Sequence, residues 1–127
     1  MEKLLIFHLD DTNYRKLEQI AHSLKIICEK VLDTSYNQTI EALASGKINP
    51  LVAPVTGRVP AESLLLMCNL TDKHMDKLLA ELRKKNVPVD YKAILTPTNQ
   101  KWTVFQLMLE MYREKEAVKN SLDRKIN

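Results

Sequence analysis

"LLIFHLDDTNYRKLEQI" (residues 4–20) and "LLLMCNLTDKHMDKLLAEL" (residues 64–82) are the two stretches that decide the fold of this chain. Aligned at a spacing of 61 residues, they place Leu9 on Leu70 and Asp11 on Asp72. Each stretch is a short apolar run, then a polar cluster, then apolar residues at helical spacing. The pair therefore predicts a strand followed by an amphipathic helix, built twice.

The start of each predicted helix carries the same two signals. Asp10 and Thr71 are residue types that cap helices, because their side-chain oxygens accept from the free amides of the first turn. A leucine precedes each cap, and a tyrosine or methionine stands four positions after it, which is the spacing of a hydrophobic staple. Because cap and staple recur in register, a structural repeat explains the pattern better than chance.

The similarity continues beyond the first helix of each half. Val31-Leu32 aligns with Ile94-Leu95 after a small shift, and the pair Asn37-Gln38 recurs at Asn99-Gln100. We predict strands at about 3–8, 26–32, 63–68 and 91–95, and helices at about 11–24, 35–45, 72–85 and 98–115. Thr96-Pro97 is predicted to be the N-cap and first residue of the last helix.

These elements predict an α/β fold in which two tandem βαβα pseudo-repeats share one four-stranded, mostly parallel sheet. The halves are residues 1–46 and 62–116, within a single domain that spans 1–127. An α+β, ferredoxin-like fold is the alternative. The segment 46–61 between the halves holds both glycines and three of the five prolines. It is predicted to be a packed linker, and a role as an interaction segment stays open.

Composition narrows the class of protein. With 45% hydrophobic and 28% charged residues, the chain is typical of a soluble globular protein. It has no apolar run of membrane-spanning length and no signal-peptide pattern, so we expect a cytoplasmic location and no membrane partner. Cys28 and Cys68 lie in apolar segments, as buried cysteines do. A pI near 8.8 without aromatics between the lysines disfavours nucleic acid as a partner.

A ligand site, if present, is predicted at the carboxyl ends of the strands. If all four strands run the same way, the polar residues that follow them gather at one end of the sheet. Aspartates at most of these strand ends would repel phosphate, whereas "TPTNQKW" (residues 96–102) carries a lysine and no acid. The candidate residues for binding an anion or nucleotide are His8, Asn69, Thr96, Thr98, Asn99 and Lys101.

An apolar stripe on the last helix suggests a different role. Trp102, Met108 and Met111 are the candidate interface residues, although a tryptophan at this spacing is more often part of a core. We find no catalytic motif, no metal-ligand spacing and no cofactor motif, so catalytic residues, metal and cofactor are all predicted as none. An enzyme using His8 or Cys68 ranks last among the hypotheses.

The second half resembles a small, uncharacterised bacterial family of domains of unknown function. The resemblance rests on residues 63–116, about two-fifths of the chain, and on the pattern Leu95 to Asn99 ("LTPTN"), Trp102 and a helix with Glu110 or Glu114. The first half departs from it, with Tyr36 and Thr39 where proline and tryptophan stand. The resemblance implies a bacterial cytoplasmic protein and assigns no activity.

Together these observations favour a non-enzymatic protein-interaction or regulatory module. Its expected partner is a second copy of the chain, as in a homodimer, or another protein. The alternative is a domain that binds a small anion or nucleotide at the strand ends.

Overall fold

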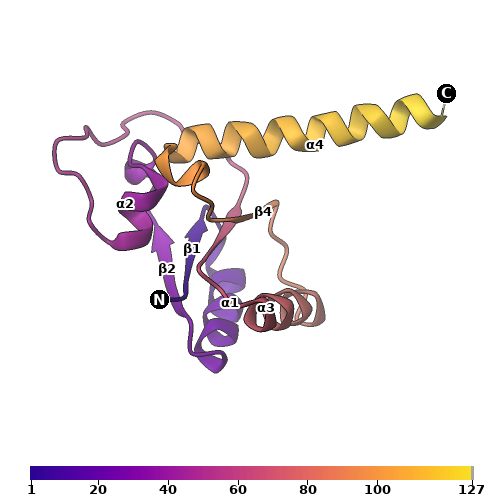
Figure 1. The fold of residues 1–127 in the computed structure, drawn as a ribbon, viewed down its shortest axis with the longest axis horizontal. Helices are drawn as coiled ribbons and strands as arrows, with labels where there is room; N and C mark the ends of the chain where they lie inside the picture. Colours follow the sequence, from indigo (N-terminus) through magenta and orange to yellow (C-terminus); the bar gives the residue numbers. More distant parts are fainter. Residues whose placement is uncertain (127) are drawn as a thin grey trace.

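The computed structural model describes the backbone of residues 1–126 and the side chains of residues 1–119 (Figure 1). The strands are β1 (Lys3–Phe7), β2 (Ile27–Val31), β3 (Leu64–Cys68) and β4 (Tyr91–Ile94). The helices are α1 (Asp11–Ser23), α2 (Ile40–Ser45), α3 (Asp72–Lys84) and α4 (Val104–Ile126), with 3-10 turns η1 (Asp33–Ser35) and η2 (Asn99–Lys101). The predicted order of strand, helix, strand, helix in each half is confirmed, and the chain does not adopt the ferredoxin-like alternative.

One sheet holds the four strands in the order β2-β1-β3-β4. β1 pairs parallel with β2, and β3 pairs parallel with β4. The central strands β1 and β3 run antiparallel, with Leu5 opposite Leu66. The prediction of one mostly parallel sheet shared by both halves is therefore confirmed, whereas the expectation that all four strands run the same way is wrong.

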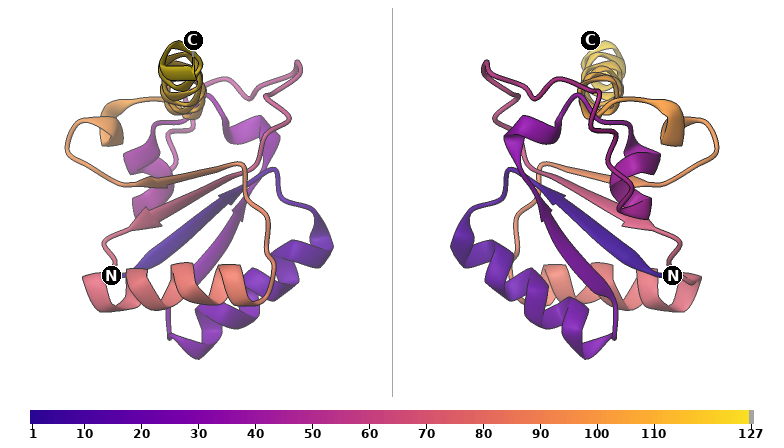
Figure 2. Two further views of the ribbon diagram at one scale, coloured as in Figure 1. Left: turned by 90° about the vertical axis from the view of Figure 1, so that its right-hand side faces the viewer. Right: turned by 90° about the vertical axis from the view of Figure 1, so that its left-hand side faces the viewer.

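Helices cover both faces of the sheet, with α1 and α3 on one face and α2 and α4 on the other (Figure 2). The central strands read "KLLIF" and "LLLMC" because both of their faces are buried. Leu4, Ile6, Leu65 and Met67 point into the α1/α3 core, whereas their neighbours Leu5, Phe7, Leu64 and Leu66 point into the α2/α4 core. Both cores thus draw side chains from both halves.

The repeat has two spacings in the structure. α1 and α3 begin and end 61 residues apart. Ile27 and Tyr91 occupy equivalent positions at the start of β2 and β4, 64 residues apart. The additional residues are 88–90, between α3 and β4. The sequence match of Asn37 with Asn99 is therefore wrong, since Asn37 is equivalent to Lys101.

The two halves are related by an approximate two-fold axis. Leu5 and Leu66 are equivalent residues and face each other at the centre of the antiparallel pair. Thr39 and Thr103 are also equivalent, and they form an isolated antiparallel bridge. In each pair, a residue of the first half contacts the equivalent residue of the second half. A two-fold axis that passes between the halves explains such contacts.

The second helix of each half begins later than the sequence suggested. Trp102 is extended, and its carbonyl accepts from the Ile40 amide at 2.8 Å. This contact between the halves holds the chain out of helical conformation until Thr39 and Thr103, which cap α2 and α4. Thr96-Pro97 leads into η2 instead of α4, so the predicted helix starts at 35 and 98 are wrong, and α4 extends beyond the predicted end at 115.

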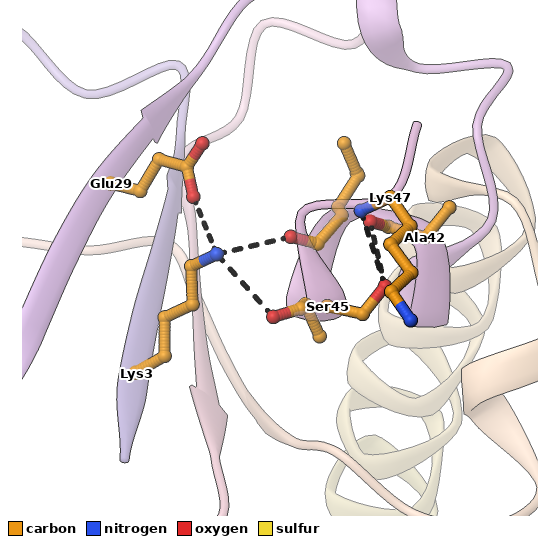
Figure 3. A network of polar contacts seen from close by, with 7 residues as sticks. Lys3, Glu29, Ala42, Ser45 and Lys47 are labelled. Atoms are coloured by element: carbon orange, nitrogen blue, oxygen red, sulfur yellow. Dashed lines mark hydrogen bonds and ion pairs between the residues drawn. The ribbon is translucent and has the colours of Figure 1, made fainter. Parts of the chain in front are cut away.

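Lys3 holds the short helix α2 against the sheet (Figure 3). Its Nζ donates to the carbonyls of Leu43 and Ala44 at 3.3 Å each and lies 2.7 Å from the Glu29 carboxylate. A cation at these carbonyls complements the negative end of the helix dipole. Gly46 then ends α2 in the left-handed conformation, with φ of 76°, as its position after the predicted helix suggested.

The linker 46–61 contains no helix or strand and is held to the body by polar contacts. The Val55 amide donates to the Thr34 carbonyl at 3.0 Å, and the Gln38 amide group exchanges hydrogen bonds with the Asn49 backbone at 2.9 and 3.0 Å. Val55 and Val59 pack on the α2/α4 core. Among residues 1–126, no helix combines the length and the apolar character needed to cross a membrane.

Candidate functional site

The polar residues that follow the strands lie at two opposite ends of the sheet. β1 and β3 are antiparallel, with Phe7 opposite Leu64. The C-terminal ends of β1 and β2 therefore lie at one end of the sheet, and those of β3 and β4 lie at the opposite end. The physical reason is the path of the linker. α2 ends beside Lys3, at the start of β1. The linker then runs back along the sheet to the end where β1 stops, and β3 begins there. The expected single rim does not form.

Asn99, a predicted ligand residue, is buried and committed to local structure. Its Oδ1 accepts from the Thr96 amide at 2.8 Å, and its Nδ2 donates to the Ile94 carbonyl at 2.9 Å. The Thr96 hydroxyl accepts in turn from the Asn99 amide at 3.0 Å. These bonds close the turn after β4, so Thr96 and Asn99 have a structural role there.

The other predicted ligand residues are exposed but dispersed. His8 follows β1, whereas Asn69, Thr98 and Lys101 follow β3 and β4 at the opposite end of the sheet. His8 and Asn69 are equivalent residues with φ of 55° and 61°. Histidine and asparagine adopt this conformation more readily than most residues, and each turns the chain from a strand toward a helix cap.

The predicted interface residues divide between core and surface. Met108 is only 3% exposed and belongs to the α2/α4 core. Trp102 and Met111 are partly buried and pack against the same core. The stripe that includes Met108 faces the sheet because α4 lies across it, and a stripe of helical period does not reveal which side it faces.

The outer side of α4 carries apolar residues that sequence reasoning missed. Leu109 and Tyr112 are about half exposed. With Pro60 and Tyr91 they line a mostly apolar hollow of about 190 Å³, in which Glu62 is the one charged side chain. The helical spacing of Phe105, Leu109 and Tyr112 is the available signal, and it belongs to the same apolar stripe that suggests an interface at Trp102, Met108 and Met111.

The two thiols do not support an enzyme that uses cysteine. Burial raises the pKa of both Cys28 and Cys68 to about 11. A thiol reacts as its thiolate, so both groups are largely protonated and unreactive at neutral pH. In the described part of the chain, no three histidine, cysteine, aspartate or glutamate side chains gather as a metal-binding group.

The comparison with known protein families finds a match, and it lies in the second half of the chain. Residues 63–118 match the family described as Domain of unknown function (DUF3783), which supports the resemblance to a small uncharacterised domain family. The match begins just before β3 and ends within α4. The LTPTN pattern and a bacterial source stay predictions. No curated protein and no solved structure matches this chain.

Proposed function

We propose that this chain is a non-enzymatic protein-interaction module that associates through the outer face of α4, and that the partner is a second copy of the chain. One observation carries the proposal: α4 continues past the body on which it packs (Figure 1). The fully buried side chains of the helix end at Met108, and Met111 is partly buried, whereas the helix runs to Ile126.

The outer part of α4 makes few contacts with the body among the described residues, such as Lys115 Nζ at 5.5 Å from the centre of the Tyr91 ring. From Tyr112 to Lys119 the side chains are exposed, except for the partly buried Glu116. An isolated helix of fewer than about 12–15 residues is marginal in water, because few hydrogen bonds offset the cost of nucleation. A contact with another molecule would stabilise this segment, and Leu109 and Tyr112 supply apolar surface on one side of the helix.

The charges on α4 suit pairing with a second copy. Glu110 and Arg113 form an ion pair at 2.9 Å, and Glu114 and Lys115 follow directly. In a two-fold dimer the same patch meets itself. A patch that carries both signs at short spacing can meet itself without net repulsion, whereas a patch of one sign cannot.

The geometry gives less support to the alternative function, a site for a small anion. The hollow beside His8 is lined by Asp10 and Asp90. Hydrogen bonds from Asn13 lower the pKa of Asp10, so this carboxylate is ionised at neutral pH and repels an anion. We keep the bacterial cytoplasm as the proposed setting, since two free thiols suit a reducing compartment.

The mass of the protein in solution tests the proposal. We expect twice the 14.7 kDa chain mass by light scattering after size exclusion, and a single-chain mass for Tyr112→Glu, which places a charge in the contact. Ile48→Glu is the matched control, because Ile48 is 50% exposed and Tyr112 is 51% exposed. A wild-type protein of single-chain mass at its highest soluble concentration would contradict the proposal, as would equal dissociation of both variants.

A further inference from the structure

The outer edge of β4 is open for a further strand. The Tyr91 and Leu95 amides donate toward β3, to the carbonyl of Ser63 just before it at 3.0 Å and to that of Met67 within it at 2.9 Å. Since alternate residues of a strand direct their main-chain groups to opposite sides, those of Lys92 and Ile94 point away from β3. The Ile94 carbonyl accepts from Asn99. Among residues 1–119, no loop amide, loop carbonyl or side chain is hydrogen-bonded to the Lys92 amide, the Lys92 carbonyl or the Ile94 amide.

A groove of about 660 Å³ runs beside this edge, between α3 and β4. Leu79 and Leu82 on α3 and Val87 and Pro88 in the following loop form most of its apolar wall. Its charged lining is basic, with Arg83 on α3 and Lys92 on β4, and no carboxylate lines it. Ile94, next to Lys92 on the same face of the strand, is 47% exposed. Main-chain groups, apolar surface and positive charge thus lie together.

The first half provides an internal comparison, because different side chains stand at the same position there. Lys30 on β2 is the equivalent of Ile94. Its Nζ lies 5.4 Å from the centre of the Tyr14 ring and 2.9 Å from the Asp11 carboxylate. The equivalent of Leu79 is Glu18. The contacts of Lys30 with Tyr14 and Asp11, and Glu18 in place of Leu79, distinguish the first half, so the groove follows from residues specific to the second half and not from the fold.

We propose that the β4 edge and the α3–β4 groove bind an extended, acidic segment of a partner protein by strand addition. The segment forms main-chain hydrogen bonds with Lys92 and Ile94, and its alternate side chains enter the groove. Apolar side chains contact Leu79 and Ile94, and carboxylates pair with Arg83 and Lys92. This surface is separate from the outer face of α4, so the inference does not depend on self-association.

A second copy of the chain does not suit this edge. Two β4 strands pairing with each other would bring the Lys92 and Arg83 side chains of both copies close together, and like charges at an interface are repulsive. Charge complementarity instead selects a partner segment with carboxylates. An acidic segment would also be attracted to the neighbouring Lys84 and Lys85 at the end of α3.

The test uses the full chain and a labelled nine-residue peptide. The peptide has a valine–threonine–isoleucine–threonine–valine centre with two glutamates at each end, and a matched peptide has lysines in place of the glutamates. We expect saturable binding of the acidic peptide by fluorescence anisotropy and binding at least about tenfold weaker for the lysine peptide. At saturation, hydrogen exchange of the Lys92 and Ile94 amides, followed by NMR, should slow by about tenfold or more.

Two variants and one control locate the site. Ile94→Glu removes an apolar contact and places a negative charge against the acidic segment, and Arg83→Glu reverses one groove charge on an exposed helix position. Each should weaken binding by about tenfold or more. Ile27→Glu is the control, because Ile27 is 45% exposed on the other edge strand, and it should change binding by less than about twofold.

Several results would overturn the inference. These are no binding of the acidic peptide up to about 1 mM, equal binding of both peptides, equal loss in Ile27→Glu and Ile94→Glu, or unchanged exchange of the Lys92 and Ile94 amides at saturation. The last result would mean that the peptide occupies the groove without adding a strand.

Discussion

At the residue scale, Tyr36 carries an unsatisfied hydroxyl in the α2/α4 core. The side chain is fully buried, and its ring packs edge-on against Phe7 and Phe105 with centroids 5.8 and 5.7 Å apart. The hydroxyl has no hydrogen-bond partner among the described residues. Burial raises the pKa of this phenol to about 12, so it stays protonated. The ring therefore stabilises the core, whereas the hydroxyl carries a desolvation cost.

Replacing Tyr36 with phenylalanine should stabilise the protein. Tyr36→Phe keeps both ring contacts and removes the buried polar atom, so we expect the free energy of unfolding to rise by up to about 1 kcal/mol. Urea denaturation followed by circular dichroism measures the change. Tyr91→Phe serves as a second tyrosine for comparison. A loss of more than about 1 kcal/mol in Tyr36→Phe would mean that the hydroxyl has a partner in solution.

Single residues near the second helices show where sequence reasoning missed a usable signal. Thr103 and Gln106 form a reciprocal capping box, in which each side chain accepts from the other's amide, at 2.8 and 3.3 Å. The spacing of threonine and glutamine three residues apart predicts such a box. Thr96-Pro97 is the predicted start because threonine followed by proline is also a helix-start signal. Here that signal starts a short 3-10 turn, and the true start is seven residues later.

At the element scale, α1 and α3 end in the same way but with different residues. Lys25 and Asn86 are equivalent residues directly after the C-caps, with φ of 58° and 53°. In both places the amide of the following residue donates back to the helix, Ile26 to Ala21 and Val87 to Leu82, at 2.9 Å. Asparagine tolerates the left-handed conformation better than lysine. The first half therefore retains strain that the second half lacks.

Exchanging these two residues tests the argument. Lys25→Asn should raise the free energy of unfolding by about 0.5–1 kcal/mol, and Asn86→Lys should lower it by a similar amount, because only the strain at a left-handed position changes. Thermal and urea unfolding measure both variants. Changes of the same sign in the two variants, or no change in either, would contradict a left-handed conformation at these positions.

At the scale of the whole molecule, neither half has a complete core. β1 and β3 are the central strands, each is buried on both faces, and each pairs with the other along its whole length. A half expressed alone would expose one edge of its central strand and parts of both cores. The match at 63–118 covers one such half, so the matched region corresponds to one of the two repeat units in this fold.

A fragment of residues 62–127 should not fold as a monomer. Removing the first half exposes the β3 edge, and the buried apolar area that remains is too small to offset chain entropy. We expect the fragment to be unfolded, or to dimerise by pairing β3 with β3 about Leu66, in the arrangement that β1 now provides. Circular dichroism and light scattering over a range of concentrations distinguish these states from a monomer. Cooperative unfolding of a single-chain species would contradict this prediction.

The sequence by itself determined the elements and the repeat. Local signals suffice for these, because caps, staples and the apolar period act within one turn or one strand, as at Asp10 and Thr71. The tertiary structure alone decided the direction of β3, the side of α4 that faces the sheet, and the open groove beside β4. Each of these depends on contacts between residues far apart in the chain. The linker brings the chain back to the end of the sheet where β1 stops, so β3 starts there and runs opposite to β1. The hydrogen bond between Trp102 and Ile40, which joins the two halves, delays the start of α4.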